Sequence, residues 1–430
     1  MASIGGYDLI SWTVLAAFAS ANLAVLYAAS SRGPTWRAWG RRQLERVSGR
    51  TGLDGLSWIP VWVAMIVIFA GVVTYGLLSG QYACSPASDG YGLVASGRAF
   101  WAGGNPFTAS ICGGSHEIPY GFAAVLIDAL GSLGGIVGIY AIWGLIAFSL
   151  VPLIWWLAGG DRLWILLYLA TSVLFLPLVA TQIDGATNAI VPATVLFTQL
   201  LPRRRERWAA IAGGFLSTAR FPNVFVQLGM TGSNRRYRAL GLLLVALTFS
   251  GVTALSYVRW GSEFLGPVLL NQIGRRSFSL NFYGVLLFAN ALPATATVEV
   301  IQAVLTLALV AAVFGKVRSP VLSASLVLTG LALVTPFLSF TILIWLLPVA
   351  LAGARARWWL WGIGVVGAVN YEVAYLVWAT LDGVTWPSSI LDLALTGLLL
   401  GLFVELWRQN ARITGPASGK PSATAGATDG

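Results

Sequence analysis

The stretch Ile136-Val-Gly-Ile-Tyr-Ala-Ile-Trp-Gly-Leu-Ile-Ala-Phe-Ser-Leu-Val-Pro-Leu-Ile-Trp-Trp-Leu-Ala158 contains no charged residue. An apolar run of about twenty residues is long enough to cross the hydrocarbon core of a bilayer as a helix. Lipid requires every backbone polar group to be paired internally, so the pattern predicts an all-α polytopic membrane protein with about 11 transmembrane helices. The other apolar runs lie near residues 8–29, 58–79, 162–180, 185–201, 239–257, 297–316, 319–336, 337–352, 357–379 and 388–406.

The composition points the same way. The chain is 57% hydrophobic and 10% charged, whereas charged residues make up about 25% of an ordinary soluble domain. The net charge of +10 would suit nucleic acid, but the arginines cluster in short loops between apolar runs, which is typical of cytoplasmic loops. We therefore expect membrane lipids as partners and no nucleic acid. The run 8–29 lacks a preceding basic segment and a following cleavage site, which favours a span over a signal peptide.

The basic loops also predict an orientation in the cell membrane. The loop after the first span holds several arginines between Arg32 and Arg50, so we place it in the cytoplasm and residues 80–135 outside. A short apolar segment near 120–134 is interrupted by Asp128. Counting it as a crossing would put the later basic loop outside, so we interpret it as a helix in the outer interface.

Residues 208–230 have basic flanks on both sides and a break at Arg220-Phe-Pro222. This pattern predicts a re-entrant helical hairpin that dips into the membrane from the cytoplasmic side. At the end of the chain, residues 409–430 consist mostly of Gly, Pro, Ser, Ala and Thr, and we expect a disordered cytoplasmic tail there.

The outer loop 80–135 carries both cysteines of the chain, Cys84 and Cys112, and its only histidine, His116. Two cysteines on one side of the membrane, in an oxidising compartment, favour a disulfide over two free thiols. Two cysteines and one histidine are fewer ligands than a usual zinc site has. We therefore expect neither a metal nor another cofactor.

Asp89 stands in this loop just beyond the span 58–79. The stretch 91–103 after it is typical of an interfacial amphipathic helix, and Gly103-Gly104-Asn105-Pro106 should end that helix by turn chemistry. A carboxylate at the lip of the bilayer suits a general base that reaches a lipid-linked substrate from the water side. The alternative is that Asp89 only caps the helix.

The pattern Asp89-Gly-Tyr91, followed by Gly97-Arg98-Ala-Phe-Trp-Ala-Gly103-Gly104-Asn105-Pro106-Phe107, resembles the first outer loop of GT-C fold membrane glycosyltransferases. It is most similar to glycosyltransferase family 87, the polyprenyl-phosphate-mannose-dependent mannosyltransferases of actinobacteria. The resemblance covers residues 58–290. Its other parts are Ile118-Pro119-Tyr120-Gly121-Phe122, Thr181-Gln182-Ile-Asp184, Gly213-Gly214-Phe215 with Arg220-Phe221-Pro222, and Asn271-Gln272-Ile273.

The resemblance implies a GT-C-like bundle that moves a sugar, with mannose expected, from a polyprenyl-phosphate donor to a lipid or glycan acceptor on the outer face, with inversion. Asp89 would be the general base that deprotonates the acceptor hydroxyl. The phosphate leaving group needs cations, and Arg275, Arg276 and Arg220 are the candidates because a guanidinium binds phosphate well. Arg275 and Arg276 could instead contact lipid headgroups, and Arg220 could pair with a buried acid such as Glu372.

Further residues complete the predicted site. His116 and Glu117 are candidates for acid–base chemistry, although a solvated loop is the commoner setting for such residues. Aromatic residues of the outer loop could stack on sugars or belong to an interfacial belt. The acids Glu372 and Asp392 fall within or at the edge of spans, where they either serve function or form ion pairs. The predicted substrate-binding residues are Tyr91, Arg98, Trp101, Tyr120, Gln182 and Asp184.

The sequence thus divides into four parts: an added N-terminal helix and basic loop (1–57), a GT-C-like catalytic module (58–290), C-terminal transmembrane helices (291–408) and the tail (409–430). The main alternative function is a transporter or flippase of a lipid-linked substrate, and a polymerase or ligase of surface glycans is a third. Transporters often show paired broken helices in two repeats. This chain shows one break, near Pro222, and no clear internal repeat.

Overall fold

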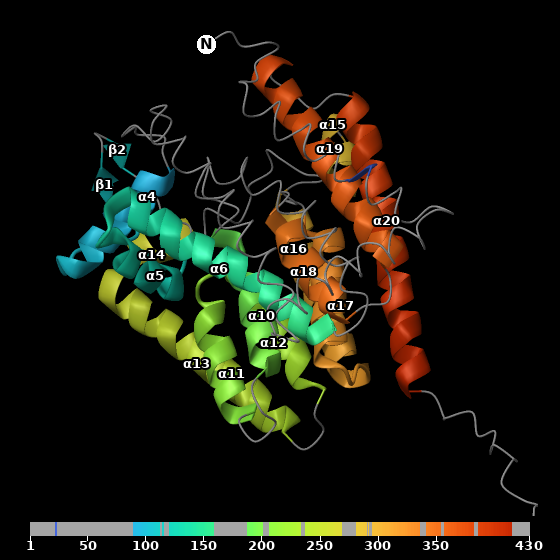
Figure 1. Cartoon of the computed structure of the whole chain (residues 1–430), viewed down its shortest axis with the longest axis horizontal. Helices are drawn as coiled ribbons and strands as arrows, with labels where there is room; N and C mark the ends of the chain where they lie inside the picture. Colours follow the sequence, from blue (N-terminus) through green and yellow to red (C-terminus); the bar gives the residue numbers. More distant parts are fainter. Residues whose placement is uncertain are drawn as a thin grey trace, which may run out of the picture.

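The computed structural model of the chain describes residues 22–23, 89–111, 114–115, 120–158, 187–200, 206–233, 237–268, 281–289, 291, 295–335, 341–353, 357–381 and 386–414. Within these ranges the secondary structure consists of helices, joined by turns and short irregular segments, and one antiparallel pair of two-residue strands, β1 (Ser110–Ile111) and β2 (Gly114–Ser115). The helices are α4 (Asp89–Trp101), α5 (Phe122–Ser132), α6 (Gly135–Ala158), α10 (Ile190–Leu200), α11 (Glu206–Ser217), α12 (Asn223–Thr231), α13 (Arg238–Trp260), α14 (Ser262–Val268), α15 (Phe282–Phe288), α16 (Thr295–Lys316), α17 (Pro320–Val334), α18 (Thr341–Gly353), α19 (Arg357–Leu381) and α20 (Trp386–Thr414) (Figure 1).

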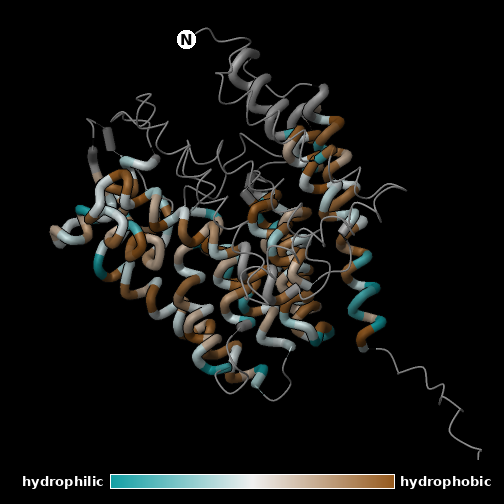
Figure 2. The backbone as a smooth tube through the Cα atoms, in the orientation of Figure 1, coloured by the Kyte–Doolittle hydropathy of each residue, from teal (hydrophilic) through white to brown (hydrophobic). Residues whose placement is uncertain are grey.

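Three of the described helices are long and apolar enough to cross a membrane: Arg238–Trp260, Thr297–Lys316 and Ser389–Thr414. Hydrophobic residues run along most of α13 (Figure 2), and some of them are far from any core: Val258 is 82% exposed and Leu255 is 71% exposed. Water would penalise such a surface, whereas lipid would not. The predicted spans near 8–29, 58–79 and 162–180 lie outside the described ranges, apart from Asn22 and Leu23.

The basic ends of these long helices lie together. Arg238, at the start of α13, donates a 2.6 Å hydrogen bond from Nε to the carbonyl of Gly232, at the end of the hairpin. Arg318, just after α16, also donates to that carbonyl, and Asn410 of α20 donates to the carbonyl of Lys316. The residues that the arginine pattern assigns to one side of the membrane therefore share one end of the bundle. The assignment of that end to the cytoplasm stays a prediction.

The opposite end of α13 reaches a separate layer of short helices. Figure 1 shows α4, α5 and α14 gathered with β1 and β2 at this end. Trp260 donates from Nε1 to the carbonyl of Gly104, and Arg259 donates to the carbonyl of Gly103. These two bonds join the end of α13 to the loop that follows α4.

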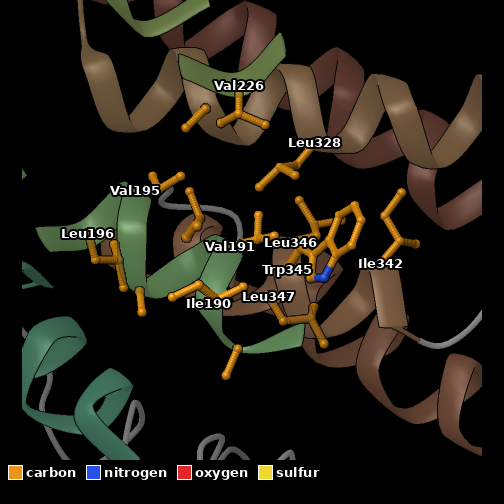
Figure 3. Packing of buried hydrophobic residues seen from close by; sticks show 14 of the residues in the cluster. Ile190, Val191, Val195, Leu196, Val226, Leu328, Ile342, Trp345, Leu346 and Leu347 are labelled. Carbon is orange, nitrogen blue, oxygen red and sulfur yellow. The ribbon is translucent and has the colours of Figure 1, made fainter. Parts of the chain in front are cut away.

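The hydrophobic core lies where α10, α12, α17 and α18 meet. Val195, Val226, Leu328 and Leu346, one from each helix, have no exposed surface and point toward one another (Figure 3). The helix α17 is buried along nearly its whole length, as expected of a helix that is apolar on every side. Its N-terminus is capped by Ser319, whose side chain accepts a hydrogen bond from the Leu322 amide.

The end of the bundle differs from the sequence prediction. The span predicted near 388–406 continues as α20 to Thr414, past the expected start of a disordered tail at residue 409. The reason is tertiary packing: Gln409 and Asn410 are buried, and Asn410 bonds to the end of α16. The composition of this segment carries no sign of that contact.

Candidate functional site

The helix predicted after Asp89 is present as α4, which begins at Asp89 itself. Its residues 92–97 are buried, and its placement in the membrane interface stays a prediction. The helix ends just before Gly103 and Gly104, as the turn residues predict. Gly103 has a φ of +72°, the Gly104 amide bonds to the Ala99 carbonyl and the Gly103 amide bonds to the Phe100 carbonyl. This is the hydrogen-bond pattern of a Schellman motif, in which a left-handed glycine closes a helix.

Two glycines let α4 lie close to its neighbours. A Cβ atom on Gly90 would lie 2.8 Å from Ile136 of α6, and one on Gly97 would lie 2.3 Å from the carbonyl oxygen of Asp128 in α5. Trp101 adds a 2.7 Å hydrogen bond from its indole nitrogen to the Ala129 carbonyl. The helix that starts at Asp89 is thus fixed against α5 and α6.

The helix α5 occupies the segment predicted to lie in the outer interface. Its 11 residues span about 16 Å, which is too short to cross a bilayer. Its N-terminus rests on the tip of the helical hairpin: the Gly121 amide donates to the Ala219 carbonyl at 3.2 Å, and the Ala123 amide donates to Thr218 Oγ1 at 3.2 Å.

The predicted break in residues 208–230 is confirmed, whereas the entry of this helix pair into the membrane stays a prediction. The helices α11 and α12 are separated by turns at residues 218–222, so the break falls at Arg220-Phe-Pro222 as predicted. Pro222 stands directly before α12 as its N-cap, a position where the missing amide hydrogen of proline costs no helical hydrogen bond. The break presents Arg220 at the hairpin tip, next to the start of α5.

Arg220 belongs to a polar cluster that we call the Arg220 cluster, made of Tyr120, Thr187 and Arg220. The guanidinium carbon of Arg220 lies 3.9 Å from the centre of the Tyr120 ring. Arg220 Nη2 donates to Thr187 Oγ1 at 3.3 Å, and Thr187 Oγ1 in turn lies 3.4 Å from the Tyr120 hydroxyl. Tyr120 and Thr187 are buried and Arg220 is half-buried. A cation is therefore held among an aromatic face and hydroxyl groups, with little water.

The Arg220 cluster is supported from two further directions. Asn188, next to Thr187, accepts a 2.9 Å hydrogen bond from the indole nitrogen of Trp345 in α18. On the other side, Phe221 at the hairpin tip packs against a buried cluster that includes Phe107 and Phe264. The surroundings of the hairpin tip thus come from the segment after α4, from α14 and, through Asn188, from α18.

The structure brings together two of the predicted site residues: Tyr120, predicted to bind substrate, and Arg220, predicted to bind the donor phosphate. Tyr91, Arg98 and Trp101 lie on α4, where Arg98 and Trp101 are exposed. The indole nitrogen of Trp101 is used in packing against α5. The backbone of Asp89 starts α4, and its side chain is outside the described part of the chain. Eight predicted site residues lie wholly outside it, namely Cys84, Cys112, His116, Glu117, Gln182, Asp184, Arg275 and Arg276.

Sequence reasoning missed Thr187, Asn188 and Trp345 as members of the site. The sequence does contain a signal for the first two, because Thr187 and Asn188 are polar residues at the start of an apolar run, where a helix can make polar contacts. Trp345 gave no such signal, since it lies in the middle of an apolar run. Its role depends on a contact across 157 residues.

Two buried acids also have defined surroundings. Asp392 of α20 accepts a 2.6 Å hydrogen bond from the Asn370 amide of α19, and both side chains are buried. Asp128 of α5 is buried and accepts a 2.9 Å hydrogen bond from the indole nitrogen of Trp143. Burial raises the pKa of the Asp128 carboxyl well above its ordinary value, and the bond from Trp143 opposes that rise. Among the described residues, no group of three or more histidines, cysteines and acids could hold a metal ion.

Comparisons with protein-family models, with curated proteins and with solved structures give no match for this chain.

Proposed function

We propose that this chain is a membrane glycosyltransferase. It moves a sugar, mannose by the resemblance of its motifs, from a polyprenyl-phosphate donor to a lipid or glycan acceptor, with inversion. The observation that carries the proposal is the Arg220 cluster, in which an arginine at the tip of a membrane hairpin lies against Tyr120 and Thr187. The finer architecture, a GT-C-like bundle of about 11 spans with its site facing outside the cell, is part of the same proposal.

The Arg220 cluster has the chemistry needed for the leaving group. When the glycosidic bond to the phosphate breaks, negative charge grows on the phosphate oxygens. A guanidinium held in a half-buried position stabilises that charge more strongly than it would in water. Its planar fork of donors also matches phosphate oxygens. Arg275 and Arg276 are candidates for the same phosphate from the second outer loop.

The acceptor side of the reaction is assigned to Asp89. Its carboxylate takes the proton from the acceptor hydroxyl as that oxygen attacks the anomeric carbon of the donor sugar. The new glycosidic bond forms as the bond to the lipid phosphate breaks, and the phosphate leaves as an anion next to Arg220. The helix α4 packs on α5, and the N-terminus of α5 contacts the hairpin tip, so α5 connects the helix that starts at Asp89 with the hairpin that carries Arg220. That the base and the cation serve one site is part of the proposal.

The test is Asp89→Asn in purified, lipid-reconstituted protein supplied with radiolabelled polyprenyl-phosphate sugars. Loss of a general base should slow transfer by about 10²–10⁴-fold, whereas asparagine caps a helix as well as aspartate. Binding of polyprenyl phosphate should be unchanged, which controls for folding. Near-normal transfer by the variant would reduce Asp89 to a helix cap. Wild-type protein that transfers none of the sugars would contradict the proposed function, and translocation of the lipid without transfer would favour the transporter alternative.

A further inference from the structure

The side chain of Asp128 takes no part in the proposed reaction, yet it lies where three helices of the outer layer meet. It belongs to α5 and is enclosed by α4 and α6. We propose that Asp128 is a positioning residue that fixes α4 against α5 and α6, and that it does so as an uncharged carboxylic acid.

The surroundings of the carboxyl group argue for the uncharged form. Asp128 has no exposed surface. Its Oδ1 atom accepts a hydrogen bond from Trp143 Nε1, while Oδ2 is buried and has no hydrogen-bond partner among the described residues. An ionised carboxylate needs several donors or a counter-ion to offset its loss of hydration. A single indole N–H does not supply that.

The neighbouring helix supplies no donor for an ionised Oδ2 either. The helices α4 and α5 touch at this point, because a Cβ atom on Gly97 would lie 2.3 Å from the Asp128 carbonyl oxygen. Ser96, the residue before Gly97, is buried, but its hydroxyl has no hydrogen-bond partner among the described residues and so does not donate to Oδ2.

The charged and titratable groups on the described helices around α5 do not offset a charge on Asp128. Arg98 of α4 is exposed, and Arg259 of α13 donates to the Gly103 carbonyl. Neither α6 nor the rest of α5 has a charged residue. The pKa of Asp128 is accordingly governed by burial and by the Trp143 bond, with no contribution from a charged neighbour on these helices. The full set of charged and titratable residues on the described helices that pack against α5 is Asp89, Tyr91 and Arg98 of α4, Tyr140 of α6, Glu206 and Arg207 of α11, and Arg238, Tyr257 and Arg259 of α13.

The position matters because α4 begins at Asp89 and crosses Asp128 at Gly97. These two points on α4 are about 12 Å apart along the helix axis. Ionisation of Asp128 would place an uncompensated charge under the middle of α4, and the favourable response is for α4 to move away and admit water. The start of α4 would move with it.

The direction of the pH effect follows from the raised pKa. Below the ordinary carboxyl pKa of about 3.9, both the folded and the unfolded chain hold the proton, and the contribution of Asp128 to stability is fully present. Above that pH the unfolded chain ionises while the folded chain keeps its proton. The folded-to-unfolded ratio then falls by about tenfold per pH unit, until the folded-state pKa is reached.

The test compares unfolding of the wild type, Asp128→Asn and Glu263→Gln as full-length chains in the same lipid nanodiscs across a pH series. The amide that replaces the carboxyl group in Asp128→Asn cannot ionise. The folded-to-unfolded ratio of this variant, divided by that of the wild type, should therefore grow by up to about tenfold per pH unit above the ordinary carboxyl pKa. Glu263 is exposed and accepts a hydrogen bond from Asn105; Glu263→Gln keeps an oxygen for that bond and is the matched control in which an exposed carboxyl group is removed. Parallel curves for Asp128→Asn and wild type would overturn the proposal. The readout is unfolding, so it is independent of whether the chain transfers sugar.

A second measurement covers the case in which Asp128→Asn does not fold. Infrared spectra of the wild type at neutral pH should contain a protonated carboxyl band that shifts in Trp143→Phe, because the carbonyl oxygen loses its hydrogen bond. A spectrum in which no such band shifts would overturn the proposal. A purely structural role for the Asp128 side chain would move neither the pH profile nor this band.

Discussion

Replacement of Arg220 tests whether the Arg220 cluster binds phosphate. The guanidinium lies over Tyr120 and bonds to Thr187, so Arg220→Gln removes the positive charge and leaves a polar side chain that can still bond to Thr187. Arg220→Lys keeps the charge and removes the planar fork. The two variants separate the contribution of charge from that of geometry.

The magnitude follows from the half-buried position of the side chain. A hydrogen bond to a charged group contributes about 1.5–3 kcal/mol, and a tenfold change in Kd corresponds to about 1.4 kcal/mol. Arg220→Gln should therefore weaken binding of a short-chain polyprenyl phosphate by about 10- to 150-fold. Arg220→Lys should lose about 1 kcal/mol, or about fivefold, because it keeps the charge but not the bidentate contact.

The assay is equilibrium binding of radiolabelled short-chain polyprenyl phosphate to protein in nanodiscs, with thermal unfolding to check that each variant is folded. Arg412→Gln is the matched control. Arg412 is exposed at the far end of α20, where its ion pair with Glu405 spans 3.9 Å, and its loss should leave binding unchanged. A folded Arg220→Gln protein that binds as tightly as wild type would refute the reasoning. The phosphate site would then have to lie with Arg275 and Arg276.

Two further predictions concern the frame around this cluster. Gly121→Ala should destabilise the protein by about 1–3 kcal/mol in thermal unfolding, because the added Cβ would overlap the Thr218 carbonyl oxygen. The control is Gly251→Ala in α13, where no described atom lies near the new Cβ, and this change should be neutral or stabilising. Equal losses of stability for both variants would contradict the contact of α5 with the hairpin tip. Mass spectrometry of non-reduced peptides should show Cys84 linked to Cys112, as expected for cysteines of one outer loop; thiols that remain free to alkylate would contradict it.

The features predicted correctly from the sequence are those that local chemistry decides. Gly103 ends α4 because glycine readily adopts the left-handed conformation required there. The second helix of the hairpin begins directly after Pro222, because proline is tolerated at a helix start but not in a helix interior. The segment near 120–134 forms a short helix because its apolar run is too brief for a span. Each of these follows from neighbouring residues in the chain.

The features that were missed depend on contacts between distant residues. Thr187 meets Arg220 across 33 residues, and Asn188 meets Trp345 across 157 residues. Apolar periodicity shows that such helices are buried but not which faces meet. The extension of α20 to Thr414 has the same cause, since it rests on the contact of Asn410 with the end of α16.

The contact between α5 and the hairpin tip has a consequence for biogenesis. The Ala123 amide bonds to Thr218, which follows it by 95 residues in the chain. At about 5–20 residues per second, a ribosome needs about 5–20 s to make the segment between them. During that interval the N-terminus of α5 has been synthesised, while the hairpin that satisfies its amides does not yet exist. The layer of α4, α5 and α14 therefore cannot reach its final arrangement until the hairpin has been made, and the Arg220 cluster is completed late in folding.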